Sequence, residues 1–347
     1  MNIYLLLIIL LIFIGSKVFI KDFNVNYMSK DTTSSIKGIF ILVVFYSHLV
    51  SYTIVNKSKD FLMFKLKKYL GQLMVTMFLF YSGYGVYESI KKNKSKYIKS
   101  IPKKRVLITL FNFMVAVLMF EIINPLIGRS LPLRNNLLSF IGWESVGNSN
   151  WYIFGILFMY LITYFSFVFF EKEDKKAILS TWIFVIIFCL FMALYKDDYW
   201  YNTLFCYPLG LTYSFYKEKI EKLMLKNKKY FIGLIATAIA FIVLYKYKSV
   251  NWVYYQFLSM IFCLLIVFIT MKFNINNKIL KWLGDNLFWM YILQRIPMLV
   301  FRYLGLANNE YSYAAACLIV TIILSFVFSN IIKKVDEKIL SLINHTS

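Results

Sequence analysis

Long apolar runs recur along the whole chain, and this feature limits the fold more than any other. A helix needs about 20 mostly apolar residues to cross the roughly 30 Å hydrocarbon core of a bilayer. The chain is 60% hydrophobic and only 16% charged, which is too apolar for a surface in contact with water. We therefore predict an all-α fold, a polytopic bundle of about eleven transmembrane helices near residues 1–20, 36–55, 70–90, 105–127, 150–170, 177–195, 199–216, 230–247, 252–272, 285–304 and 312–332.

The basic residues predict the orientation of these spans. The chain has 39 Lys and Arg against 17 Asp and Glu, and the basic residues lie between apolar runs rather than along one face, so nucleic-acid binding is not expected. Short loops rich in Lys and Arg stay on the cytoplasmic side. The most basic loop, residues 91–105, is therefore placed inside, and counting spans from it also places residues 172–176, 217–229 and 272–281 and the C-terminal tail in the cytoplasm.

Three segments depart from a regular series of spans and short loops. Lysines 57, 59, 65, 67 and 68 would lie outside, which indicates either a helix on the membrane surface or a misplaced early span. Residues 1–20 lack a basic start and a small-residue cleavage site, so we expect an extra transmembrane helix that is retained rather than a cleaved signal peptide. Residues 128–150 form the longest predicted outer loop, which contains the polar run GNSN before Trp151.

No metal site and no separate soluble domain are expected. Cys189, Cys206, Cys263 and Cys317 stand singly in or beside apolar runs, as buried free thiols do, and no CxxC pair or neighbouring histidine accompanies them. There is no internal repeat and no low-complexity tail, so the chain is predicted to form one membrane bundle.

His48 is the first candidate for chemistry. The only other histidine, His345, lies in the C-terminal tail, whereas His48 lies within the second span. A polar group in hydrocarbon costs free energy unless it faces protein or a water-filled cavity. His48 is then either a functional residue or a bundle histidine bonded to a neighbouring carbonyl or hydroxyl. Lys37 precedes it by eleven residues, about three helical turns or roughly 16 Å, and is either an anion-binding residue at the inner rim or a snorkelling anchor.

Several motifs resemble acyltransferase family 3, the bacterial membrane O-acyltransferases. They are, in order along the chain, IKGIFILVVFYSHLV (36–50), FLFYSGYGVYES (78–89), YIKSIPKKRVLITLF (97–111), NSNWYIFGILFMYL (148–161), FCYPLGLTYSFYKEKI (205–220) and LGDNLFWMYILQRIP (283–297). The ordered set covers nearly all of the chain after the first span. The resemblance implies a ten-helix acyltransferase domain over residues 36–334, preceded by the extra helix at residues 1–20.

The resemblance also implies an activity. Members transfer an acyl group, here expected to be acetyl from cytoplasmic acetyl-CoA, to a hydroxyl of a cell-envelope glycan or a similar acceptor. In that family a histidine eleven residues after a basic residue is essential, which implies that His48 is the catalytic base. The expected setting is the bacterial cell membrane, with membrane lipid, acyl-CoA and the acceptor as partners, no metal, and a homo-oligomer left open.

The candidate donor-binding residues are cations, namely Lys37, Lys103, Lys104, Arg105 and Arg295. The family usually has Arg where this chain has Lys37, and lysine lacks the planar fork that binds phosphate through two parallel hydrogen bonds. For Lys103, Lys104 and Arg105, positive-inside anchoring is the alternative. Arg295 lies within the tenth span and requires a partner, which is a thioester carbonyl, a phosphate or Glu121.

The candidate acceptor-binding residues are Tyr81, Ser82, Glu121, Asn150, Trp151 and Gln294. Gln294 stands where the family tends to have a histidine. Close helix packing is the alternative for Tyr81 and Ser82, together with Gly83 and Gly85, and the interfacial aromatic belt is the alternative for Trp151.

A membrane transporter or flippase of a lipid-linked or anionic glycan precursor is the competing function. Polar residues at mid-membrane would fit it, but such folds usually show repeats or helices broken by paired Gly and Pro, and the sequence shows neither. A scaffold would need an exposed recognition domain. A glycan polymerase would be expected to have its catalytic residues on the outer side.

Overall fold

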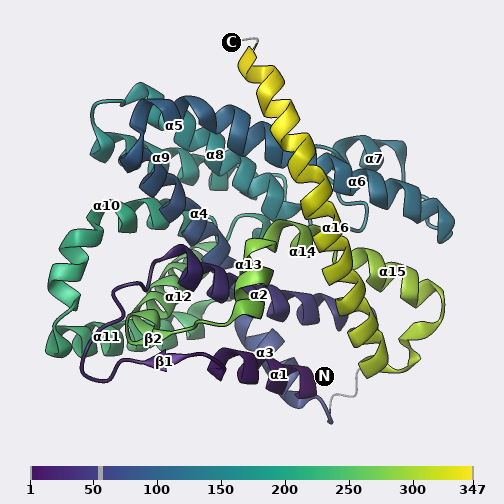
Figure 1. Ribbon diagram of the computed structural model, residues 1–347, viewed down its shortest axis with the longest axis horizontal. Coiled ribbons are helices and arrows are strands. Elements are labelled where there is room, and N and C mark those ends of the chain that lie inside the picture. Colours follow the sequence, from purple (N-terminus) through teal and green to yellow (C-terminus); the bar gives the residue numbers. More distant parts are fainter. Residues whose placement is uncertain (1, 54–57, 346–347) are drawn as a thin grey trace.

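The computed structural model describes residues 2–53 and 58–345, and the side chains only as far as residue 342. The described chain is almost entirely helical (Figure 1), and the all-α class is confirmed. The first half contains α1 (Asn2–Phe13), α2 (Lys30–Leu49), α3 (Phe61–Leu70), α4 (Leu73–Lys92), α5 (Lys94–Ile101), η1 (Pro102–Leu107), α6 (Ile108–Leu126), α7 (Leu133–Ser139) and α8 (Trp151–Phe169). The second half contains α9 (Asp174–Ala193), η2 (Asp198–Trp200), α10 (Cys206–Met224), α11 (Asn227–Tyr247), α12 (Trp252–Lys272), α13 (Lys278–Asp285), α14 (Leu287–Leu293), α15 (Arg295–Tyr303), η3 (Leu306–Asn308) and α16 (Glu310–His345).

Seven of the described helices are long and apolar enough to cross a membrane. They are α2, the continuous helix of α5, η1 and α6, then α8, α9, α11, α12 and α16. Helices α4 and α10 have similar lengths, 20 and 19 residues, but carry more polar residues and pack against each other inside the bundle. A helix that is shielded by its neighbours needs less apolar surface than one that faces lipid.

The N-terminal segment is shorter than the predicted span of residues 1–20. Helix α1 has 12 residues, or about 18 Å, and then gives way to the short strand β1 (Lys17–Val18). This strand pairs antiparallel with β2 (Phe273–Asn274), the other described strand. The Tyr4 ring stacks on Tyr46 of α2 at 5.0 Å. The segment therefore packs along α2, and its helix alone is too short to cross the hydrocarbon core.

The basic stretch that breaks the charge rule contains α3. Lys57 lies outside the described residues, but the other four lysines flank or belong to this ten-residue helix. Phe61, Leu62 and Tyr69 are exposed on it beside the lysines. A short helix with lysines and exposed apolar side chains fits the surface-helix alternative.

The predicted span at residues 285–304 is not one helix. It consists of α14 and α15, with a break from α13 at Asn286 and a second break at Gln294. At the first break, both the backbone amide and the side-chain amide of Asn286 donate to the Trp282 carbonyl, the latter at 2.9 Å. The backbone bond is the ordinary i→i−4 bond of a helix, whereas side-chain bonds to nearby backbone compete with continuation of a helix. The sequence shows no sign of broken helices, and this was an argument against a transporter. The structure contains such a helix, so that argument is lost.

Two glycines let the broken segment approach α2. A Cβ atom at Gly38 would collide with the Leu280 carbonyl, and one at Gly284 would collide with the Ser34 carbonyl. The two backbones are therefore in direct contact where α2 and α13 cross. Lys37 and Asp285 are the chain neighbours of these glycines, so this crossing brings them into one site.

A second glycine pair joins α4 and α10. Gly83 faces the Tyr207 carbonyl, and Gly210 faces the Phe80 carbonyl, each without room for a Cβ atom. By contrast, nothing lies within 4 Å of the Cβ position at Gly85. The packing alternative for the FLFYSGYGVYES motif is therefore correct for Gly83 but not for Gly85.

Candidate functional site

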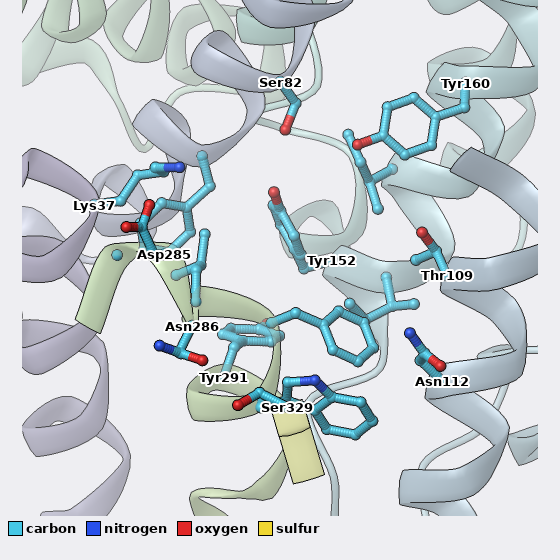
Figure 2. A pocket seen from close by; sticks show the side chains of 17 residues that line it. Lys37, Ser82, Thr109, Asn112, Tyr152, Tyr160, Asp285, Asn286, Tyr291 and Ser329 are labelled. Carbon is cyan, nitrogen blue, oxygen red and sulfur yellow. The ribbon is translucent and has the colours of Figure 1, made fainter. Parts of the chain in front are cut away.

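A cavity of about 390 Å³ lies between the helices at the end of the bundle that carries the most basic loops, called here the basic end. Helices α2, α4, α6, α8 and α16 and the break between α13 and α14 all contribute to its wall (Figure 2). Its polar lining residues are Lys37, Ser82, Thr109, Asn112, Tyr152, Tyr160, Asp285, Asn286, Tyr291 and Ser329. We call it the inner pocket.

One side of the inner pocket is lined by a cation, Lys37, and a carboxylate, Asp285. In Figure 2 the Lys37 side chain extends toward the cavity beside the Asp285 carboxylate. Ser34 donates a 2.7 Å hydrogen bond to Asp285, which holds that carboxylate on α2. The charges of Asp285 and Arg105 both act on Lys37. Lys30 also acts on Lys37, so the cations around this side of the pocket outnumber its one carboxylate, which favours an anionic ligand.

Three hydroxyl groups meet on the other side of the inner pocket. Tyr152 and Ser82 point toward each other in Figure 2, and the Tyr160 hydroxyl points into the same space. The Ser82 hydroxyl interacts with both tyrosines. Of the predicted residues, Lys37 and Ser82 are thus brought to one cavity from two helices.

The basic run Lys103, Lys104 and Arg105 lies within the π-helical segment η1, directly before α6. Arg105 points inward and its Nε donates to the Tyr97 hydroxyl at 3.1 Å. Lys103 and Lys104 instead line a separate surface cavity of about 380 Å³ together with Lys96 and Lys99. A π-helical turn changes the direction of successive side chains and often marks a functional site. Tyr97 belongs to the wall of this second cavity and so connects it to Arg105.

His48 lies deeper in the bundle and does not line the inner pocket. Its Nδ1 is buried with no hydrogen-bond partner. Arg295, whose own Nε is also buried without a partner, and Lys67 act electrostatically on the ring. Burial lowers the pKa of Lys67, which lies on α3 outside the spans. The sequence left open that the His48 ring is hydrogen-bonded to a neighbouring carbonyl or hydroxyl. Nδ1 of His48 makes no such hydrogen bond.

Tyr291 lies between the inner pocket and the His48 region. Its ring lines the pocket and packs against Tyr152 at 5.4 Å between centroids. Its backbone carbonyl accepts a 2.8 Å hydrogen bond from Gln294, which is fully buried and has an unpartnered Oε1. Arg295 acts on the Tyr291 hydroxyl. The break between α14 and α15 thereby brings Gln294 and Arg295 next to the wall of the pocket and to His48.

The other predicted residues lie away from this group. The Tyr81 hydroxyl is buried without a partner on the side of α4 that faces Cys263 and Tyr213. Asn150 donates to the Gly142 carbonyl at 2.8 Å, which closes the loop before α8, and Trp151 packs on Tyr152 at 6.1 Å.

Glu121 lines a cavity of about 410 Å³ with Arg129 near the end of α6. It forms no ion pair with Arg295 among the described residues, so it is not the partner that the sequence offered for that arginine.

Sequence reasoning missed the aromatic and broken-helix parts of the site. Tyr152, Tyr160 and Tyr291 lie in apolar runs, where a tyrosine is indistinguishable from core packing. Asp285 and Asn286 lie inside the LGDNLFWMYILQRIP motif. A carboxylate at the edge of an apolar run is itself a sign of a functional site, and Asp285 could have been found from it. Among the described residues, no group of three His, Cys, Asp or Glu side chains could hold a metal ion.

Comparison with known proteins agrees with this architecture. The acyltransferase family 3 model, described as an acyltransferase domain, matches residues 34–330, which is most of the chain. No curated protein and no solved structure matches significantly. The match includes Lys37, His48 and the broken segment from α13 to α15. The chain therefore belongs to acyltransferase family 3 and is a multi-pass membrane acyltransferase.

Proposed function

We propose that this protein transfers an acetyl group from acetyl-CoA, entering at the basic end from the cytoplasm, to a hydroxyl group of an envelope glycan or similar acceptor. The observation that carries the proposal is the position of Tyr291, which borders the inner pocket on one side and the His48 and Arg295 region on the other. A donor held in the pocket would have its thioester near this wall. The acceptor would approach from the opposite end of the bundle.

In the proposed step, His48 removes the proton from the acceptor hydroxyl through its unpartnered Nδ1. The hydroxyl oxygen attacks the thioester carbonyl, the new C–O bond forms and the C–S bond breaks. The proton then passes from the imidazolium to the leaving CoA thiolate, so the products are an ester and free CoA. Arg295 is suited to stabilise the negative charge that develops on the carbonyl oxygen.

Charge supports entry of the donor at the basic end. CoA carries several phosphate negative charges, and Lys37, Arg105 and the four lysines of the surface cavity offer cations at that end. Charge-assisted hydrogen bonds to phosphate are roughly twice as strong as neutral ones. The basic loops that retain this end in the cytoplasm would then also attract the donor.

Replacement of Lys37 by methionine is expected to raise the KM for acetyl-CoA by about 10- to 100-fold, because one hydrogen bond to a charged group contributes about 1.5–3 kcal/mol. Lys37→Arg should keep wild-type affinity or improve it, since it restores the family's usual residue and its two-pronged contact with phosphate. Initial rates over a range of acetyl-CoA concentrations measure both effects. An unchanged KM in Lys37→Met would remove this residue from the donor site.

The decisive experiment measures acceptor-dependent release of free CoA by the purified protein in nanodiscs, with an extract of envelope glycans as acceptor. Mass spectrometry of the extract should show a gain of one acetyl group per modified hydroxyl. Hydrolysis of acetyl-CoA without acetylated product would contradict the proposed acceptor chemistry.

A transporter or flippase is the second candidate, and the break between α13 and α15 favours it because interrupted helices are common at transport sites. It predicts movement of an unmodified glycan precursor across proteoliposomes without CoA release. The same purified protein can be used for both assays, so a positive result in one and none in the other separates the two functions.

A further inference from the structure

A cavity of about 460 Å³ lies at the end of the bundle opposite the basic end. It is bordered by the loop that follows α6, by the second half of α15, and by Tyr52 after α2. The ends of α6 and α15 lie on the same side of the molecule (Figure 1). We call this cavity the outer pocket. Its lining residues are Tyr52, Ile127, Arg129, Leu299, Arg302 and Tyr303. The lining thus has two guanidinium groups and no carboxylate.

The positive charge of the outer pocket is not neutralised by protein. Among the described residues, no ion pair includes an arginine. Glu121 shares a neighbouring cavity with Arg129, but it does not border the outer pocket. Arg302 is exposed and Arg129 is half-buried, so both guanidinium groups can receive an anion from outside the chain.

Arg129 is held in place by the loop before α8. Its Nη1 is buried without a hydrogen-bond partner. Gly147 lies against it with a φ of +110°, and a Cβ atom at that position would be 3.1 Å from Nη1. Asn124 fixes the same loop by donating to the Val146 carbonyl at 2.8 Å. The guanidinium is therefore positioned by backbone packing, with donor capacity left unused.

The outer pocket shares one face of α15 with Arg295, which acts on the proposed catalytic histidine. Arg295, Leu299 and Arg302 occupy positions i, i+4 and i+7 of α15, so they lie on one face of that helix. The distance along the axis from Arg302 to Arg295 is about 10 Å. Tyr52, on another wall, follows His48 by four residues. An acceptor anchored in the outer pocket would have to extend by this distance along α15 to bring a hydroxyl to Arg295 and His48.

We propose that the outer pocket binds a phosphate group of the acceptor, so that the acyltransferase acts on a hydroxyl located about 10 Å or less from a phosphodiester or phosphomonoester. Arginine forks match phosphate oxygens with two parallel hydrogen bonds, and two such residues can hold one phosphate. Tyr52 and Tyr303 supply aromatic faces beside it. This inference rests on the proposed function, because it assigns the acceptor class of the same reaction.

Calorimetry on the full-length protein in a neutral detergent tests the proposal independently of catalysis. The probes are a short-chain phosphatidylglycerol, a soluble glycerol phosphate oligomer and a neutral glycoside. Arg129→Gln and Arg302→Gln should each weaken binding of a phosphate probe about tenfold or more, whereas Arg134→Gln, an exposed arginine of α7 outside the pocket, should have no effect. Binding of the lipid alone would identify a headgroup, and binding of the oligomer would identify a polymer.

Kinetics with acetyl-CoA completes the test. The two pocket variants should raise the KM of a phosphate-bearing acceptor and leave the KM of acetyl-CoA unchanged. Equal phosphate binding by wild type and the Arg129→Gln/Arg302→Gln double variant, or equal use of the neutral glycoside, would overturn the proposal. If no acceptor is acetylated while phosphate binding still depends on both arginines, the proposed reaction fails and the anion site stands.

Discussion

Replacement of His48 by alanine is expected to lower the rate of acetyl transfer by about 10²- to 10⁴-fold, the usual contribution of a general base. The bundle should stay folded, because Nδ1 of His48 makes no hydrogen bond that the substitution could break. The loss should appear in kcat and not in the KM for acetyl-CoA, since the ring lies outside the inner pocket that is proposed to bind the donor.

Two further variants sharpen this experiment. His48→Gln keeps a polar side chain of similar size but cannot accept a proton at neutral pH, so it should be as inactive as His48→Ala. His345→Ala, which removes the other histidine, should have wild-type activity. Size-exclusion chromatography and thermal stability verify folding of each variant. Retention of a tenth or more of the wild-type rate by both His48 variants would show that another group takes the proton.

Replacement of Gly38 or Gly284 by alanine is expected to abolish most of the folded protein. A Cβ atom at either position would collide with backbone of the opposing helix, which cannot rotate away as a side chain can. Overpacking of a core by one methyl group commonly costs about 1–3 kcal/mol, and backbone obstruction adds to it. Helices α2 and α13 would have to separate, which would also move Lys37 away from Asp285.

Gly85→Ala is the matched control for this prediction. The position lies in a helix with open space around its Cβ, and alanine in a helix is more favourable than glycine by roughly 0.5–1 kcal/mol. Its melting temperature in detergent should therefore equal or exceed that of the wild type. A stable, active Gly284→Ala protein would mean that the contact between α2 and α13 is looser than the structure indicates.

Hydropathy was enough to predict a helical membrane bundle, but it could not predict how the helices are shaped. Residues 285–304 read as one span, and yet a hydrogen bond from the Asn286 side chain to the Trp282 carbonyl accompanies a break. Residues 1–20 also read as a span, but the helix ends at Phe13, and the chain then pairs as a strand with residues that are more than 250 positions away. The pairing of two strands so far apart in the chain depends on tertiary contacts, which cannot be predicted from the composition of either segment.

The candidate site was likewise predictable only in part from the sequence. The eleven-residue interval between Lys37 and His48 on an apolar helix, together with the ordered motifs, was sufficient to predict acyltransferase family 3, and the family match agrees. The partners of these residues come from distant segments: Asp285 and Tyr291 from the broken helix, and Tyr152 from α8. Only the packing of the bundle could identify them.

The sequence by itself thus determined that this protein is helical and lies in a lipid bilayer, because both follow from the length of its apolar runs. It also determined the family, which follows from the order of local motifs. The tertiary structure decided which polar groups share a cavity and which remain unpaired. Arg129 and Arg302 show the reason. They are 173 positions apart, and only the convergence of α6 and α15 makes them one cationic pocket.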